Sequence, residues 1–490
     1  MTTSSSAPSI ATASEPASVA SWGDLLGRRH GWCAVALTGG VALHAINVHI
    51  VTTILPSVVG DIGGLAYYAW NVTLFVVTSI IGSTLTGKLL SRLGARSAYL
   101  LSLAVFGAGA MLCAGATSMG WMLAGRAVQG IGGGLLASLG YALIPLVFEQ
   151  RLWSRAIALV SGMWGISTLL GPAVGGLFAA GGHWRLAFFA LLPLLLLQAA
   201  LVVGQLGPRR VRAQSDVHQA MPLGRILLLA LSVLLVALAA QTEQTWAAAA
   251  CVLGGAVLGL WVARIDLRSR ISLLPRDGYR LSRVMGCAFA CISLLVLASC
   301  VEIFVPYFLQ TLHGFAPLGA GYATAAMAGG WSVGSLAGSG RSASAAARMI
   351  RLGPWLMLLG LVALALLLPS LLPTRLLASA ALVDVLMVLA LAVTGLGIGI
   401  GWPHLVARAM QAARPGEENL TSAAITTVQL YAMAIGAALA GLIANQAGLG
   451  LSGGQEEEGA RQAAWVLFAA FALAPAMATV LTRRLVAHGE

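Results

Sequence analysis

The chain is a series of long apolar stretches separated by short polar loops. Between residues 32 and 486 it contains repeated runs of about 18 or more mainly apolar residues, the length that an α-helix needs to cross a bilayer. The pattern predicts an all-α protein that spans a membrane fourteen times. The predicted helices lie near 32–58, 69–90, 97–116, 119–147, 154–180, 184–206, 223–241, 244–263, 284–311, 317–339, 350–371, 376–407, 420–446 and 463–482.

Composition supports a membrane protein and argues against several other classes. Of the 490 residues, 59% are hydrophobic and only 9% are charged, whereas soluble proteins carry about 25% charged residues. The six cysteines all lie in apolar stretches, so they predict no metal site. The sequence also contains no clustered nucleophile and base of the kind that would suggest an enzyme. The net charge of +12 does not require a nucleic-acid partner, because the positions of the basic residues explain it better.

The basic residues predict the orientation in the membrane. With a cytoplasmic N-terminus and fourteen helices, 24 of the 28 Lys and Arg residues fall in cytoplasmic loops, whereas Arg185, Arg375 and Arg461 fall outside. This bias is the one that the positive-inside rule describes. We therefore expect both termini to face the cytoplasm of a bacterium, with the protein in the cytoplasmic (inner) membrane. The acidic segment 453–461 is expected to be an outer loop.

Two basic stretches, 207–225 and 264–283, divide the chain. Residues 1–30 lack the basic start and short apolar core of a signal peptide, and we expect a disordered cytoplasmic tail. The remainder divides into a six-helix bundle at 31–206, an inserted helix pair with flanking basic loops at 207–283, and a second six-helix bundle at 284–486. Two similar halves are typical of transporters whose site lies between them at the midplane.

A short basic loop, GKLLSRLGARS (87–97), joins the second and third predicted helices. It resembles motif A of the major facilitator superfamily, which braces the inward gate. The loop departs from the family pattern at Ser91, where aspartate is usual, and at Ala95, where arginine is frequent. The family's bracing ion pair is therefore missing or relocated. The matching residues are Gly87, Leu89, Arg92, Gly94 and Arg96.

Arg126 stands alone in an apolar run, where a charge costs about 2.5–3.5 kcal/mol on insertion scales. It shares a helix face with Gln129, and Gly130 and Gly133 allow a neighbouring helix to approach, so the charge can face protein or a cavity. The segment GRAVQGIGGG (125–134) resembles motif B of the same superfamily. The resemblance implies that Arg126 and Gln129 assist proton exchange. A structural arginine capped by carbonyl groups is the alternative.

The fifth predicted helix contains SGMWGISTLLGPAVGG (161–176), which resembles the superfamily's motif C, a feature associated with antiporters. Its matching residues are Gly171, Pro172, Gly175 and Gly176. Proline removes one backbone hydrogen bond, and small residues four apart permit close helix crossing. We expect a bend and tight packing where two helices move against each other.

The first predicted helix contains LHAINVHIVTTILPSVVGDIGG (43–64), which resembles the first-helix motif of the fourteen-helix drug:proton antiporters. On the register set by Leu55 and Pro56, Asn47 takes the place of the family's aspartate and cannot ionise. His49 can titrate near neutral pH. A neutral histidine hydrogen-bonded to a carbonyl group is the alternative for His49, and equally for His44.

Two acidic residues lie well inside predicted helices, and an intramembrane acid suggests function. Glu302 shares a face with Pro306 and Gln310. Burial favours the protonated acid and an approaching cation favours the carboxylate, so a proton and a cationic substrate would compete for it. Asp384 lies nearer the outer end, where simple solvation is the alternative.

The resemblance implies a major facilitator superfamily fold of two six-helix bundles plus two inserted helices. It also implies proton-coupled antiport that exports amphipathic, aromatic or cationic drugs by alternating access, driven by the proton motive force without a cofactor, in a monomer. The alternatives are a dedicated exporter or importer of one metabolite, favoured by Asn47 and Ser91, and a non-transporting receptor or assembly protein. The expected coupling residues are Glu302, Arg126, Gln129, Asp384 and His49. The expected pocket residues are Asn47, Gln310, Tyr307 and Trp164. For Tyr307 and Trp164, a place in the interfacial aromatic belt or in the core is the alternative.

Overall fold

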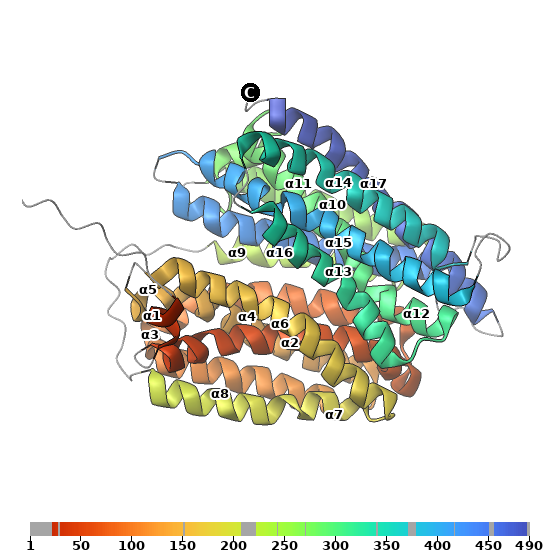
Figure 1. The fold of residues 1–490 in the computed structure, drawn as a ribbon, viewed down its shortest axis with the longest axis horizontal. Helices are drawn as coiled ribbons and strands as arrows, with labels where there is room; N and C mark the ends of the chain where they lie inside the picture. Colours follow the sequence, from red (N-terminus) through yellow and green to blue (C-terminus); the bar gives the residue numbers. More distant parts are fainter. Residues whose placement is uncertain are drawn as a thin grey trace, which may run out of the picture.

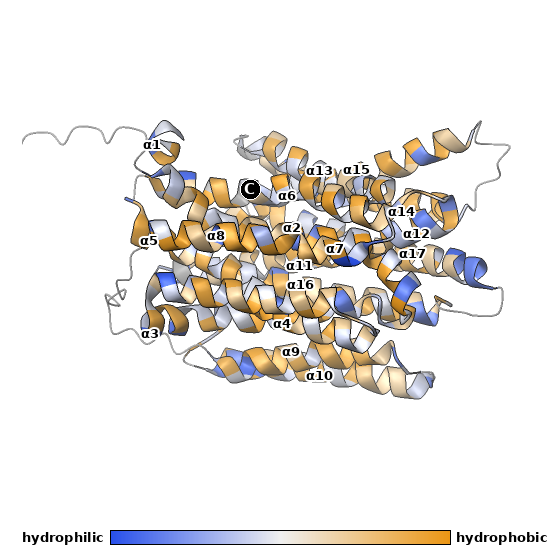
Figure 2. Cartoon of the chain, turned by 90° about the horizontal axis from the view of Figure 1, so that it is seen from below, coloured by the Kyte–Doolittle hydropathy of each residue, from blue (hydrophilic) through white to orange (hydrophobic). Residues whose placement is uncertain are grey.

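Helices form all the regular structure of the described residues, and they gather into two groups (Figure 1). The N-terminal group runs from α2 to α8, and the C-terminal group runs from α11 to α17. The helices α9 and α10 lie together along one side of both groups (Figure 2). The computed structural model describes residues 22–27, 30–149, 152–206, 222–242, 244–269, 271–339, 342–370, 379–415, 417–449 and 455–487.

Each predicted apolar run overlaps one or more of the observed helices, although several bounds differ. The N-terminal part contains α1 (Trp22–Leu26), α2 (Gly31–Ile62), η1 (Leu65–Tyr67), α3 (Trp70–Ala114), α4 (Met119–Ala142), α5 (Ile144–Val147), α6 (Trp153–Ala180), α7 (Trp184–Phe189) and α8 (Leu191–Gln205). The pair α9 (Leu223–Ala239) and α10 (Thr245–Arg268) is followed by η3 (Arg276–Tyr279). The C-terminal group contains α11 (Val284–Ser299), η4 (Cys300–Phe304), α12 (Val305–His313), α13 (Pro317–Gly338), α14 (Ala343–Leu367), α15 (Ala380–Gln411), α16 (Glu418–Gln446) and α17 (Glu456–Ala487).

The helix α3 contains a break that lets its two arms run side by side. It has 45 residues, which would measure about 68 Å if straight, more than twice the apolar thickness of a bilayer. Gly94 interrupts it with φ 80° and ψ 169°, a conformation that glycine adopts readily. A Cβ on Gly130 of α4 would lie 2.0 Å from Thr78 in the first arm, and a Cβ on Gly109 in the second arm would lie 2.3 Å from the Gln129 nitrogen. Both arms therefore pack on α4.

Ten helices among the described residues are long and apolar enough to cross a membrane, judged by length and composition. One of these candidates covers residues 65–114 and so includes both arms of α3. The predicted number of fourteen is not confirmed by this count. Part of the charge pattern behind that prediction lies outside the described residues, namely Arg28, Arg29, Arg151, Arg209, Arg210, Arg212, Arg270, Arg341 and Arg375.

Several boundaries differ from those expected. The acidic segment 453–461 was predicted to be a loop, but α17 begins at Glu456, and Glu457 forms an ion pair with Arg461 one turn later at 2.5 Å. Acidic side chains stabilise the first turn of a helix because they face its positive dipole end. Similarly, α10 continues to Arg268, into the predicted basic loop. Residues 22–26 of the predicted tail form α1 with Leu25 buried, while residues 1–21 and 28–29 lie outside the described residues.

The two groups meet near one end, which we call the Asp61 end because Asp61 and the loops 63–69, 181–183 and 314–316 lie there. The other end, with Gly94, is called the Gly94 end. At the Asp61 end a Cβ on Gly176 of α6 would lie 2.6 Å from the Leu318 Cα of α13. A Cβ on Gly321 would lie 2.7 Å from Thr53 of α2. These close approaches join the N-terminal group to the C-terminal group.

Candidate functional site

A chain of polar side chains crosses the core of the N-terminal group. Arg126 on α4 donates from Nε to the Asn71 carbonyl oxygen at 3.1 Å and from Nη1 to Gln129 Oε1 at 2.5 Å. Gln129 then donates from Nε2 to Oδ1 of Asn47 on α2 at 3.0 Å. Arg126 is 1% exposed, and the side chains of Gln129 and Asn47 are fully buried. The face predicted for α4 therefore reaches Asn47, whose side chain cannot ionise.

The guanidinium of Arg126 has no carboxylate partner within the described part of the chain. Its Cζ lies 4.1 Å from the centroid of the Phe75 ring, so a cation–π contact adds to the two hydrogen bonds. A buried charge without a counterion is costly, even where dipoles and an aromatic face compensate it in part. The site in the N-terminal group thus carries an excess of positive charge.

Glycines let α4 pack directly on backbone atoms of α3. A Cβ on Gly134 would lie 2.0 Å from the Ser79 carbonyl oxygen, and a Cβ on Gly133 would lie 2.6 Å from His44 Nδ1. Real Cβ atoms do not approach other heavy atoms so closely, so larger residues at Gly133 and Gly134 would push the helices apart. The glycine run therefore holds Phe75 and His44 beside Arg126.

The two histidines of α2 face different partners. His44 is 8% exposed, stacks on Phe75 with 5.3 Å between centroids and meets the edge of Trp164 at 5.8 Å. Its Nδ1 has no hydrogen-bond partner among the described residues. His49 is half-buried, and its Nε2 lies 3.4 Å from the Thr168 hydroxyl on α6. The partner of His49 is thus a hydroxyl group and not the carbonyl group of the alternative.

The glycines that resemble motif C pack α6 against both groups. A Cβ on Gly171 would lie 2.3 Å from the His49 Cβ, and a Cβ on Gly175 would lie 3.0 Å from the Ile50 carbonyl oxygen. Gly176 faces α13 of the other group, and Pro172 lies 3.1 Å from the Cβ that Gly321 would carry. The segment therefore joins α2 of its own group to α13 of the C-terminal group.

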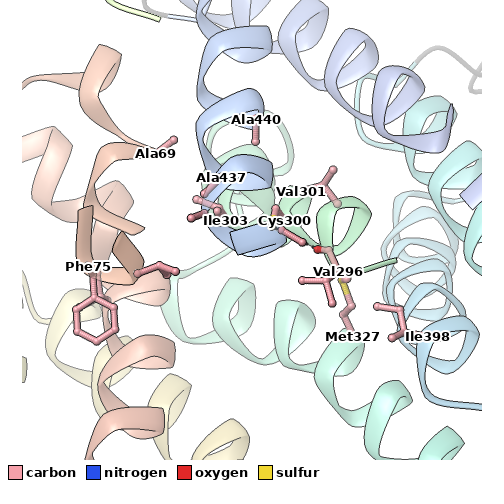
Figure 3. Packing of buried hydrophobic residues seen from close by; sticks show 14 of the residues in the cluster. Ala69, Phe75, Val296, Cys300, Val301, Ile303, Met327, Ile398, Ala437 and Ala440 are labelled. Carbon is pink, nitrogen blue, oxygen red and sulfur yellow. Dashed lines mark hydrogen bonds between the residues drawn. The ribbon is translucent and has the colours of Figure 1, made fainter. Parts of the chain in front are cut away.

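Glu302 lies where the helical segment 284–313 changes from α- to 3₁₀-geometry. The turn η4 separates α11 from α12, and Glu302 is its third residue. The side chain is half-buried, and no hydrogen bond or ion pair joins it to any residue in the described ranges. Its neighbours Cys300 and Ile303 lie close to Ala437 on α16 (Figure 3). A carboxyl group without a protein partner, among apolar neighbours, is a candidate for binding a proton or a cation.

Tyr307 and Gln310 line a different region, at the Asp61 end. With Thr311 they face Pro56 and Gly60 of α2 across a pocket of about 360 Å³. The Gln310 Nε2 atom has no partner among the described residues. Asn47 is fully buried in the polar chain and does not line this pocket, and Trp164 is 38% exposed on α6. The residues predicted to form one pocket therefore occupy separate places.

The remaining predicted residues are more isolated. Asp384 is half-buried, four residues after α15 begins, and no ion pair among the described residues links it to another element.

In the segment resembling motif A, Gly87 has no atom within 4 Å of an added Cβ, Arg92 is exposed and Arg96 is half-buried. The Ser91 hydroxyl donates to the Lys88 carbonyl oxygen at 3.0 Å. No group of three or more His, Cys, Asp or Glu residues in the described ranges could hold a metal ion.

Two parts of the polar chain are not evident in the sequence. The Asn71 carbonyl group and the Phe75 ring complete the surroundings of Arg126, and both come from the first arm of α3. They are ordinary residues of an apolar run, and only the packing of α3 on α4 gives them this place.

The described helices, ten of them long and apolar enough to cross a membrane, are those of an integral membrane protein. The family model of the Major Facilitator Superfamily matches residues 37–437, and the chain belongs to this superfamily of transporters, which are not enzymes. It is 40% identical over 483 residues to a probable multidrug-efflux transporter of Mycobacterium tuberculosis, in both strain CDC 1551 / Oshkosh and strain H37Rv. These alignments cover 97% of this chain and 99% of the relative.

Solved structures share the fold at low sequence identity. A POT family transporter in complex with 5-aminolevulinic acid is 15% identical, with a TM-score of 0.64, and the match covers 94% of this chain and 98% of that one. The E. coli xylose transporter XylE, in a partially occluded inward open conformation, is 14% identical with a TM-score of 0.57, covering 92% and 96%. At these identities the likeness establishes the fold alone.

Proposed function

We propose that this protein is a proton-coupled antiporter that exports amphipathic, aromatic or cationic drugs by alternating access. The observation that carries the proposal is the 40% identity to a probable multidrug-efflux transporter over 97% of this chain. Similarity along nearly the whole length supports a shared type of activity. The proton motive force is the proposed energy source, and a monomer is the proposed functional unit.

We propose fourteen membrane crossings in place of the ten counted by length and hydropathy. The break at Gly94 divides the candidate 65–114 into two crossings, since its 50 residues are about twice the length that one crossing needs. The helices α4, α9 and α13, of 24, 17 and 22 residues, supply the other three. This count gives two bundles, 31–206 and 284–486, with 207–283 inserted between them. It also puts the Gly94 end and both termini in the cytoplasm of a bacterial inner membrane.

In the proposed mechanism Glu302 binds either a proton or the substrate. Its carboxyl group has no protein partner among the described residues, so a positively charged or donor-bearing substrate would find a free acceptor. Burial favours the protonated acid, and an arriving cation favours the carboxylate, so each ligand expels the other. Substrate leaves when a proton enters from the outside, and it binds again when the proton leaves to the cytoplasm. For substrate to leave to the outside, the N-terminal and C-terminal helix groups must separate at the Asp61 end.

The remaining coupling residues would adjust this exchange from the N-terminal group. Arg126 places a positive charge in the core, and Gln129 carries its effect to Asn47 through the hydrogen bonds described above. His49 is a second proton-binding candidate, and Trp164 offers an exposed aromatic face to a substrate. Tyr307 and Gln310 line the pocket at the Asp61 end, where we propose that substrate leaves. We propose Asp384 as a secondary proton site near that end.

A dedicated transporter of one metabolite is the second candidate. The observation in its favour is the unpaired positive charge of Arg126 beside Asn47, because such a site suits an anionic group better than a cationic drug. A competition panel distinguishes the two candidates. Inhibition of transport by one compound class alone would favour the metabolite transporter, whereas inhibition by many unrelated dyes would favour drug efflux.

The proposal is tested by the accumulation of a fluorescent cationic dye in cells with and without the protein, before and after an uncoupler is added. We expect lower accumulation in producing cells, and equal accumulation once the uncoupler removes the proton gradient. Equal accumulation without the uncoupler, for every dye in the panel, would contradict efflux. The absence of substrate-dependent proton flux for every compound tested would instead favour a receptor or assembly protein.

A further inference from the structure

The short connection between α2 and α3 places an aromatic ring of the N-terminal group inside the C-terminal group. Tyr68 is fully buried, and its ring stacks on Phe304 with 4.9 Å between centroids and an interplanar angle of 23°. The edge of the Tyr307 ring lies 5.6 Å away at 66°. Phe304 in turn stacks on Phe308 at 6.0 Å. Tyr68 thus enters an aromatic cluster directly beyond Glu302 on the path towards the Asp61 end.

Two glycines allow the connection to turn so sharply. Gly63 and Gly64 have φ values of 70° and 80°, in the left-handed region that residues with a Cβ avoid. A Cβ on Gly64 would also lie 2.7 Å from the Met119 Cβ. The turn directs η1 and Tyr68 across the boundary between the two groups.

The same connection is held by hydrogen bonds from two other parts of the chain. The Ala66 carbonyl oxygen accepts from Asn445 Nδ2 of α16 at 2.7 Å and from Gln241 Nε2, just after α9, at 2.9 Å. Asn445 also donates to the Ala240 carbonyl oxygen at 3.1 Å. The segment from Ala66 to Tyr68 is therefore the point at which the N-terminal group, the C-terminal group and the α9–α10 pair are joined.

The Tyr68 hydroxyl works against this closure. It is buried, and no group in the described ranges forms a hydrogen bond with it. Burial of the ring favours the joined state, but a hydroxyl group that loses hydration without gaining a protein partner disfavours that state. When the groups separate at this end, the hydroxyl regains hydration. The two effects oppose each other within one side chain.

We propose that Tyr68 is the plug that closes the Asp61 end between the two groups, and that its unpartnered hydroxyl keeps the closure weak enough to open during each cycle. This closure does not depend on which cargo passes the plug. Tyr68 is a gating residue and does not need to contact the substrate. Its role in closure is therefore the same whether or not the protein exports drugs.

The test uses the full-length protein in lipid nanodiscs, with its six native cysteines replaced and spin labels on two exposed positions at the Asp61 end. Gly120→Cys in α4, where an added Cβ meets no atom within 4 Å, and Ala316→Cys just before α13 place one label on each group. Electron–electron distance distributions without substrate then report whether this end is closed or open. The variants are Tyr68→Phe and Tyr68→Ala, with Tyr67→Phe as the matched control, because Tyr67 is 40% exposed.

We expect Tyr68→Phe to raise the ratio of closed to open populations by about tenfold, equal to about 1.4 kcal/mol, and to slow turnover because opening becomes harder. Tyr68→Ala should shift the distribution to the longer distance, and Tyr67→Phe should leave it unchanged. A Tyr68→Phe distribution identical to that of Tyr67→Phe would overturn the role of the hydroxyl. A closed distribution for Tyr68→Ala would overturn the plug. Neither result depends on whether the protein transports a drug.

Discussion

The side-chain amide of Gln129 on α4 donates to the side-chain oxygen of Asn47 on α2 at 3.0 Å. Because Gln129 also accepts from Arg126, Asn47 is linked to the buried arginine through a single residue. The contact satisfies the Asn47 oxygen, but Asn47 Nδ2 has no partner in the described part of the chain. The polar chain from Arg126 to Asn47 is therefore continuous, but these three side chains include no carboxylate.

Replacing Asn47 by aspartate should stabilise the protein. Asn47→Asp keeps the acceptor for Gln129, removes the unpartnered Nδ2 donor and gives Arg126 an opposite charge nearby. We expect the free energy of unfolding to rise by about 1–3 kcal/mol, read as a higher thermal transition in detergent. Asn47→Ala, the control, should lower it. An Asn47→Asp transition as low as that of Asn47→Ala would show that Arg126 does not sense residue 47.

Removing the charge of Arg126 should affect transport more than folding. Arg126→Met keeps most of the side-chain volume, and loss of a buried charge without a counterion offsets the two lost hydrogen bonds. We expect the free energy of unfolding, read from the thermal transition, to change by no more than about 1–2 kcal/mol. Proton-driven transport should fall at least about tenfold. If Arg126→Met does not fold but Arg126→Lys does, the arginine is a structural residue.

Gly134 tests the packing that surrounds Arg126. The Cβ of Gly134→Ala would lie 2.0 Å from the Ser79 carbonyl oxygen, so α4 and α3 must move apart. We expect a loss of about 1–3 kcal/mol in unfolding free energy, measured as a lower thermal transition. Gly162→Ala on α6 is the matched control, since its Cβ meets no atom within 4 Å. Equal transitions for the two variants would contradict close packing of α4 on α3.

The segment that follows α10 depends on one buried carboxylate. Asp266 is fully buried, pairs with Arg225, and accepts from the Leu273 nitrogen at 2.8 Å and the Tyr279 hydroxyl at 2.8 Å. Asp266→Asn loses the ion pair, and we expect tryptic cleavage after Arg276 to become at least about tenfold faster. Asp277→Asn, the control, breaks an ion pair whose arginine is 58% exposed, and such pairs contribute about 0–1 kcal/mol. Equal cleavage rates for the two variants would contradict this account.

The same segment should keep its protection at alkaline pH. Burial first, and then the charge of Asp266, raise the pKa of Tyr279 above its usual value. A raised pKa in the folded state means that the stabilisation is complete below the unfolded pKa of about 10 and is lost only as pH rises through the still higher folded value. The tryptic cleavage rate relative to an unfolded reference peptide should therefore be the same at about pH 7 and about pH 9. A faster relative rate at the higher pH would contradict the donation by Tyr279.

Much of the fold could be predicted because the length of each apolar run and the positions of the charged residues can be read directly from the sequence. The spacing of Arg126 and Gln129 and the glycines after them correctly predicted one tightly packed face of α4. The start of α17 was wrong because a membrane helix can continue into water, where Glu456 and Glu457 cost little and favour the first turn. The sequence likewise did not show that helical geometry continues on both sides of Gly94, through the loop predicted between 90 and 97.

The candidate site was harder to predict because it depends on which helices are neighbours. Nothing in the sequence indicates that the Phe75 ring covers Arg126 or that Tyr68 stacks on Phe304, since these pairs lie far apart along the chain. Asn47, Tyr307 and Gln310 were expected to share one pocket, yet Asn47 belongs to the polar chain and the other two residues line the pocket at the Asp61 end. Residue type suggested the chemistry, and packing decided where each residue lies.

The central claim is that Glu302 exchanges a proton for substrate. The most direct measurement is pH-gradient-driven uptake of a fluorescent cationic dye into inside-out proteoliposomes, with the proton flux recorded in parallel. Glu302→Gln keeps the shape of the side chain but cannot ionise. The account predicts normal expression and a normal thermal transition, with dye-dependent proton flux lost. Full gradient-driven exchange by Glu302→Gln would contradict it.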